Sequence, residues 1–346
     1  MILVGYAGAM LALASRMTTR PHDAFFKKVF GAPAIAAALL RELLPPALRE
    51  AIAWETVAGE IGSFVDAAFA DRHSDLLFSA RLRTGDAALL YFLLEHQSSG
   101  DASMPLRTIA YQIRIWERFR KEHPRAPLPP VIAVLVSHVP GGWTSARSLE
   151  EMVDPVMLAI PGLTPLVPRS SMIIEDLAHL SNDDLKARSL AAYPKLALWL
   201  LRDARDPVRL LGNFGAWSSA LIEVGQTRSG IDTLGVLITY MFRVVDPVYL
   251  DELRAKLHEL GSRSEEVTMS IAEYLEEEGR KKGIKEGIKE GIKEGRIASL
   301  RSQLLFKFQK LDAGYEARLQ AATSEAIDRY LQRVLIADSL AGVFED

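Results

Sequence analysis

The stretch "ALLYFLLEHQSSGDASMPLR" (Ala88–Arg107) carries the strongest structural signal in this chain of 346 residues. An unbroken apolar run, Leu89–Leu94, leads directly into Glu95, His96 and Gln97. Such a run between turn-forming residues indicates a buried strand. Because side chains alternate along a strand, Glu95 and Gln97 share one face and His96 points to the other. The sequence therefore predicts a strand that presents a carboxylate and an amide at one end of a sheet.

The segments around this strand predict an α/β (α+β) fold in which one meander of strands lies between helices. Gly85-Asp86 is a turn signal, which favours a hairpin with the preceding strand. After residue 170 the chain is helical in character, with no clear strand, although "GVLITYMF" (235–242) is ambiguous. Taken in order, the elements are α-β-β-β-α-β, with helices at His22–Phe30 and Ala34–Leu44, strands at about 61–69, 75–82 and 87–96, a helix at Met104–His123 and a strand at Val131–Val139.

A glycine repeat, "KKGIKEGIKEGIKEGR", interrupts the C-terminal part of the chain. Its period of four exceeds the 3.6 residues of a helical turn, so each stripe drifts by about 40° per repeat. A solvated helical spacer, a self-association helix and a nucleic-acid contact are all open interpretations. The chain is thus expected to have five parts: an extension at 1–16, a mixed core at 17–170, a helical extension of that core at 171–260, the repeat helix or linker at 261–298 and a small helical unit at 299–346.

Composition restricts the function classes. There is no cysteine, which excludes disulfides and thiolate zinc sites. A formal net charge of -3 argues against a protein that coats nucleic acid nonspecifically. Residues 1–16 are too short for a membrane span and lack the basic start of a secretory signal, so we interpret them as a dispensable extension, with a cleaved signal as the alternative. We expect a cytoplasmic protein without a membrane segment.

Asp75 opens the strand that precedes the turn, and it offers Glu95 a partner. Adjacent strands lie about 4.8 Å apart, so the two carboxylates would meet at one end of the sheet. Carboxylates that close repel unless they are protonated or bridged by a cation, and oxygen ligands favour Mg²⁺ or Mn²⁺. The alternative, that both are solvated carboxylates at strand ends, stays open on this pattern alone.

Several motifs together resemble the Rpn (YhgA-like) recombination-promoting nucleases, which are also grouped as PD-(D/E)XK nuclease family transposases. The resemblance covers about residues 18–230. It implies a PD-(D/E)XK restriction-endonuclease-like core with helices after it. The motifs that carry it are "HDAFFKKVF", "SDLLF", "YFLLEHQSSGDASMPLR", "YQIRIW" and "LPPVIAVLVSH" followed by "GGW".

The resemblance assigns Asp75 as the motif aspartate and Glu95 as the first residue of the E-x-K pair, both as metal ligands. Gln97 stands where the family's lysine is usual, as in an E-x-Q variant. A glutamine orients water by hydrogen bonds but carries no charge, so more of the catalysis would depend on the metal.

Further residues are weaker candidates. We expect contacts with the DNA backbone from three residues of the following helix: Arg107, Tyr111 and Arg114. Supporting roles around the metal are assigned to Asp23, Glu42, Asp66 and His96. The first two would supply an extra carboxylate, and His96 is expected to be a structural hydrogen-bonding residue.

The function expected from the resemblance is a Mg²⁺-dependent DNA endonuclease that promotes DNA recombination or defends against foreign DNA. The alternative is a non-catalytic DNA-binding or oligomeric scaffold protein descended from a nuclease. DNA is the expected partner, with a possible homo-oligomer formed through the repeat helix.

Overall fold

The structure, a computed structural model, describes residues 21–60, 76–84 and 89–345. Contacts divide the chain into two compact units, Met1–Ala272 and Glu273–Asp346, and each is described by itself. The five-part division expected from the sequence stays a prediction.

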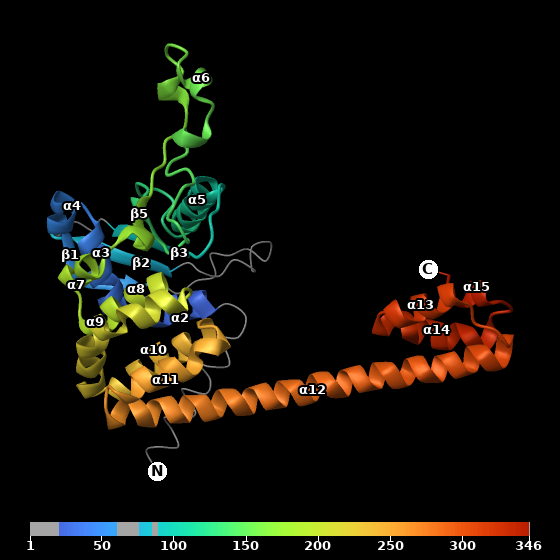
Figure 1. The fold of residues 1–346 in the computed structure, drawn as a ribbon. Coiled ribbons are helices and arrows are strands. Elements are labelled where there is room, and N and C mark those ends of the chain that lie inside the picture. Colours follow the sequence, from blue (N-terminus) through green and yellow to red (C-terminus); the bar gives the residue numbers. More distant parts are fainter. Residues whose placement is uncertain (1–20, 61–75, 85–88, 346) are drawn as a thin grey trace. The chain divides into compact units, whose positions relative to one another are not determined.

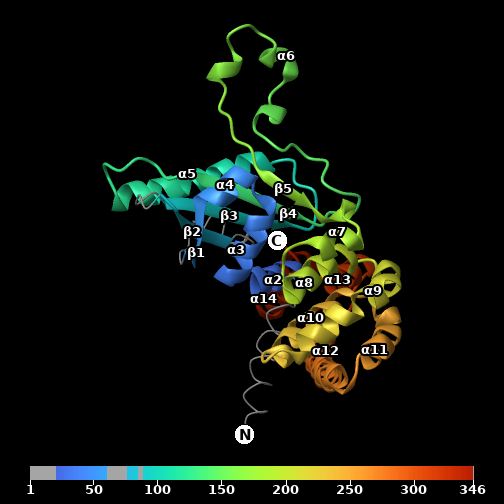
Figure 2. The same ribbon diagram turned by 90° about the vertical axis from the view of Figure 1, so that its left-hand side faces the viewer.

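A five-stranded sheet with the order β1-β2-β3-β4-β5 forms the centre of the first unit (Figure 2). β1, β2 and β3 are an antiparallel meander, whereas β4 and β5 continue the sheet in parallel with β3. The predicted hairpin pairing is confirmed, with Leu76 opposite Leu94. The strands are β1 (Ile52–Gly59), β2 (Leu76–Leu82), β3 (Leu89–Gln97), β4 (Val131–Ser137) and β5 (Ile173–Asp176).

One prediction about strands is not tested and another needs correction. The strand expected at about 61–69 lies outside the described residues, and the first described strand is β1, which the sequence reasoning missed. The expectation of no strand after residue 170 is wrong, because β5 pairs with the carboxyl end of β4. β5 has only four residues, too few to produce a periodic signal. The ambiguous stretch 235–242 lies within a helix.

Helices cover both faces of this sheet (Figures 1 and 2). On one face, Phe26 stacks on His96 of β3, with 5.0 Å between the ring centroids. On the other face, Leu135 of β4 packs with Met104. The first face carries α2 (Pro21–Phe30) and α3 (Pro33–Leu43), with α8 (Ala192–Asp203), α9 (Pro207–Gln226) and α10 (Gly230–Val244) packed around them, and the second carries α5 (Met104–Glu122).

Short elements complete the first unit. The connection from β4 to β5 contains three of them and extends away from the sheet (Figure 1). An antiparallel bridge between Ser148 and Ser171 closes the base of this extension. The remaining elements are α4 (Pro46–Ala51), η2 (Glu150–Met152), α6 (Pro155–Leu158), η3 (Thr164–Leu166), η4 (Leu177–His179), α7 (Asn182–Ala187), η5 (Pro247–Tyr249) and α11 (Leu250–His258).

The glycine repeat lies inside one continuous helix, α12 (Ser262–Phe308), so the helical interpretation of the repeat is confirmed. The isoleucines of the repeat, Ile284, Ile288 and Ile292, are each more than half exposed. The end of α12 packs with α13 (Ala313–Ala321), α14 (Ser324–Ile336) and α15 (Leu340–Val343) around a separate core that includes Leu304. Among the helices described in both units, none has the length and apolar run that a bilayer crossing needs.

Candidate functional site

The E-x-Q residues lie at the carboxyl end of β3, as predicted. In the sheet, Glu95 is opposite Leu135 and Gln97 is opposite Ser137 of β4. Because paired residues of parallel strands share a face, Glu95 belongs to the face that Leu135 presents to α5. Asp75 and Asp66 lie outside the described residues. Asp75 immediately precedes Leu76, the first residue of β2, in the sequence.

His96 is buried on the opposite face. Its Nδ1 lies 3.3 Å from Oδ1 of Asp23, and its ring stacks on Phe26 and His138. A structural hydrogen-bonding role, as expected for His96, agrees with this placement. Asp23 thus contacts the face that Glu95 does not share, which argues against the predicted role of Asp23 as an extra metal carboxylate.

Glu42 also lies away from the E-x-Q face. It is half-buried on α3, and its charge helps to raise the pKa of Glu175 on β5. Burial is the largest cause of that rise, and the adjacent Arg188, which donates a hydrogen bond to Glu175, opposes it. Glu175 pairs in register with Val136, which pairs with His96. Glu175, and Glu42 whose charge acts on it, therefore belong to the His96 face.

The predicted DNA contacts on α5 are engaged within the protein. Arg107 is largely buried and donates from Nη1 to Oδ2 of Asp101 at 2.5 Å. Burial acts to raise the pKa of Asp101, but hydrogen bonds from Ser103 and Arg107 lower it overall. Tyr111 is 5% exposed, which leaves little surface for a phosphate, and Arg114 is half-buried. These positions favour a structural role at the start of α5.

Three histidines form a stack on the His96 face, in which His96 and His138 are buried and His22 is half-buried. The centroid of the His138 ring lies 4.7 Å from that of His96 and 4.9 Å from that of His22. His22 also contacts the Tyr240 hydroxyl through Nδ1 at 2.7 Å. Burial, followed by the charge of Arg205, lowers the pKa of His22 to about 4. Burial likewise lowers the pKa of His96, against the hydrogen bond of Asp23, and the pKa of His138.

This stack predicts loss of stability in mild acid. Below pH 6.5 the unfolded chain binds protons that the folded stack resists, because burial lowers the pKa of His22 to about 4 and also lowers the pKa of His96 and of His138. The stabilisation is therefore complete above pH 6.5 and is lost as the pH falls, by up to about 1.4 kcal/mol per pH unit for each histidine. Urea denaturation at pH 7.5 and 5.5 measures this difference. His138→Phe is expected to reduce it, whereas His123→Gln, at an exposed position, serves as the control. Equal pH dependence of the wild-type and His138→Phe proteins would contradict the prediction.

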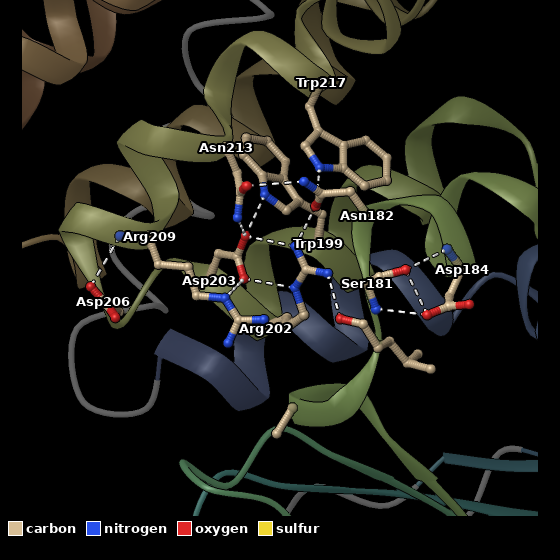
Figure 3. A network of polar contacts seen from close by, with 12 residues as sticks. Ser181, Asn182, Asp184, Trp199, Arg202, Asp203, Asp206, Arg209, Asn213 and Trp217 are labelled. Carbon is tan, nitrogen blue, oxygen red and sulfur yellow. Dashed lines mark hydrogen bonds and ion pairs between the residues drawn. The ribbon is translucent and has the colours of Figure 1, made fainter.

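A second polar cluster, which the sequence reasoning missed, connects α7, α8 and α9 (Figure 3). Asp203 is fully buried and accepts hydrogen bonds from Trp199 Nε1 at 2.8 Å, Arg202 Nε at 2.7 Å and Asn213 Nδ2 at 2.9 Å. Nε of Arg209 lies 2.9 Å from the same carboxylate. The only sequence signal is the arginine spacing in "LRDARDPVR", which resembles an ordinary exposed helix face.

Within the part of the chain that the structure describes, no group of three or more His, Cys, Asp or Glu residues has the arrangement of a metal site. The histidine rings of the stack contact one another face to face or at an edge, and their nitrogens do not converge. The metal-ligand assignment of Asp75 and Glu95 stays a prediction.

Sequence comparison identifies the family of this chain. The family described as "Putative transposase, YhgA-like" matches residues 20–230, which include the whole sheet and the helices α2, α3, α5, α8 and α9 that pack around it. The chain belongs to this family, as its motifs indicated.

Three curated relatives from Escherichia coli extend the comparison. Recombination-promoting nuclease RpnD of strain O157:H7 is 37% identical over 141 residues, which are 40% of this chain and 54% of RpnD, so the match spans about half of that relative. Inactive recombination-promoting nuclease-like protein RpnE of strain K12 is 27% identical over 270 residues, 76% of this chain and 84% of RpnE. Recombination-promoting nuclease RpnA of strain K12 is 24% identical over 270 residues, 78% and 88% of the two chains. No solved structure matches the chain.

Proposed function

We propose that this protein is a Mg²⁺- or Mn²⁺-dependent DNA endonuclease with a PD-(D/E)XK core. The observation that carries the proposal is the register of β2 and β3, in which Leu76 lies opposite Leu94. Asp75 directly precedes the first of these residues and Glu95 directly follows the second. If the ladder continues by one residue, the two carboxylates face each other across about 4.8 Å of strand spacing.

The residues at this end of the sheet suit a hard divalent cation. Asp75 and Glu95 would supply carboxylate oxygens, and the chain has no cysteine to favour a softer metal. When bound, such a cation neutralises charge on a phosphate and lowers the pKa of a water molecule. Gln97, on the same face as Glu95, would orient that water through its amide. An amide cannot accept the proton, so the role of Gln97 is positioning.

The cellular role is proposed from the relatives. RpnD and RpnA are named recombination-promoting nucleases, which supports DNA as the substrate and recombination, or defence against foreign DNA, as the outcome. A second candidate is a non-catalytic DNA-binding or oligomeric scaffold protein. It is favoured by Gln97 in place of lysine and by the relative RpnE, whose name describes it as inactive.

A plasmid-nicking assay separates the two functions. Supercoiled DNA is expected to be nicked or linearised with Mg²⁺ or Mn²⁺ and to stay intact in EDTA, because the two carboxylates need a cation to bring a phosphate close. Restoration of cutting when excess Mg²⁺ is added to the EDTA sample is the control for protein integrity. DNA that stays supercoiled in all three conditions, while it is retained by the protein in a gel-shift assay, would support the scaffold.

A further inference from the structure

A basic pocket lies beside the carboxyl end of β3. Its volume is about 370 Å³, and it is formed by the loop after β4, by η4 and by the turn between α8 and α9. The charged and titratable side chains that line it are Arg202, Arg205, Arg209, His138, His179 and Asp206. None of them was singled out in the sequence.

Two of the arginines are held rigidly by the cluster in Figure 3. Arg202 donates to Asp203 through both Nε and Nη2 and to the carbonyl oxygen of Leu180 at 2.8 Å. Arg209 contacts the same carboxylate. The side chain of Arg202 is 1% exposed and contributes charge to the wall, whereas that of Arg209 is 38% exposed. Because the guanidinium of Arg209 is already ordered, a ligand that binds it pays little of the usual ordering cost.

Arg205 differs from these two arginines in its contacts. It is exposed, and its Nη1 donates to the carbonyl oxygen of Ser98 at 2.5 Å. No carboxylate pairs with Arg205 among the residues that the structure describes. The neighbouring Asp206 instead caps α9 by accepting the backbone N–H of Arg209.

The charges that face the pocket leave it basic. Three arginines, Arg202, Arg205 and Arg209, line the pocket together with a single carboxylate, that of Asp206. Two further carboxylates are close by but do not line the pocket: Asp203 is paired with Arg202 and Arg209, and Asp176 lies 2.9 Å from Nδ1 of His179. The exposed guanidinium of Arg205 is the group best placed to receive an anion.

The pocket is one residue away from the candidate catalytic strand. Ser98, which receives the hydrogen bond of Arg205, directly follows Gln97. The backbone N–H of His138 donates to the carbonyl oxygen of Gln97 at 3.0 Å, which fixes the pocket wall to the same strand. An anion in this pocket would therefore lie at the same end of the sheet as the proposed cutting site, but on the side of the His96 face.

We propose that this pocket binds a backbone phosphate of DNA, with Arg205 as the main contact. The inference rests on the proposed function for the identity of the anion and adds a residue that positions the substrate. Guanidinium groups match the geometry of phosphate oxygens, and phosphate contacts fix the register of a protein on DNA.

The test is DNA binding in EDTA, measured by fluorescence anisotropy of a short labelled duplex over a series of NaCl concentrations. Arg205→Gln is expected to weaken binding several-fold and to reduce the slope of log K against log salt by about 0.9, the effect of one phosphate contact. Arg205→Lys, which keeps the charge, should retain most of the slope. The matched control is Arg83→Gln, which also removes an exposed arginine that donates to a carbonyl oxygen, that of Ile52, at the other end of the sheet.

Each outcome decides the proposal. If Arg205→Gln binds DNA with the affinity and salt slope of Arg83→Gln, the assignment is wrong. It is also wrong if the wild type binds inorganic phosphate or a deoxynucleoside monophosphate through Arg205 but does not bind the duplex. Arg205-dependent DNA binding without cleavage in any metal would support the pocket and contradict the nuclease, so the two failures are distinguishable.

Discussion

Replacement of Glu95 by glutamine is expected to reduce metal-dependent DNA cleavage by more than about 100-fold. Removal of a residue that hydrogen-bonds to a metal ligand typically lowers metal affinity or activity about 10–100-fold, and removal of the ligand itself should lower activity at least as much. The substitution removes one negative charge and keeps the size of the side chain. The backbone of Glu95 pairs in register with Leu135 of β4, so the strand itself should be preserved.

The measurement is the initial rate of plasmid nicking with Mg²⁺, together with the melting temperature of each variant. Glu55→Gln is the matched control, because Glu55 is an exposed carboxylate on β1 of the same sheet. This control should cleave at the wild-type rate. Both variants should melt within a few degrees of the wild type, since substitutions away from buried polar networks change stability by less than about 0.5 kcal/mol.

Asp75→Asn provides the second half of the test. If Asp75 and Glu95 hold the same cation, either substitution alone should remove nearly all activity, and the double variant should be little worse than each single one. Wild-type rates for Glu95→Gln would remove this residue from the catalytic centre. Independent, additive losses for the two substitutions would mean that the carboxylates do not act together.

The sequence predicted those parts of the fold whose signals are local. β2, β3, β4 and α5 agree with the predicted elements because each has a periodic or continuous apolar pattern of its own. β1 was missed because its eight residues, "IAWETVAG", include the polar residues Glu55 and Thr56, which interrupt the apolar pattern. It also directly follows "PALREA", a segment rich in helix-forming residues. β5 depends on pairing with β4, about forty residues earlier, and no local pattern encodes that contact.

The same distinction applies to the candidate site. The placement of Gln97 and His96 on opposite faces follows from strand alternation alone, and the structure agrees with it through the burial of His96 against α2. The roles given to Arg107 and Tyr111 rested on charge and spacing, which say nothing of the local partner Asp101 or of burial. The basic pocket could not be predicted from the sequence, because its arginines are brought together only when α7, α8 and α9 pack against one another.

Asp203→Ala is expected to destabilise the first unit by about 3–5 kcal/mol, the usual cost when one partner of a buried ion pair is removed. The carboxylate is fully buried, and its loss leaves the guanidinium of Arg202, with a side chain 1% exposed, without a counter-charge. The indole N–H of Trp199 and the amide of Asn213 also lose their acceptor. For a domain of this size, the melting temperature should fall by roughly 6–20 °C.

Urea denaturation measures the loss, and Asp206→Ala is the control. Asp206 is three residues further on and exposed, and it contributes a helix cap worth about 1 kcal/mol. Asp203→Asn keeps the shape and one acceptor but not the charge, so its effect should fall between the two alanine variants. If Asp203→Ala lowers the free energy of unfolding by no more than Asp206→Ala does, Arg202 must find solvent or another partner. In that case Asp203 would not be the group that orders Arg202 and Arg209 at the wall of the pocket. The low ordering cost inferred for phosphate binding would then lose its structural basis.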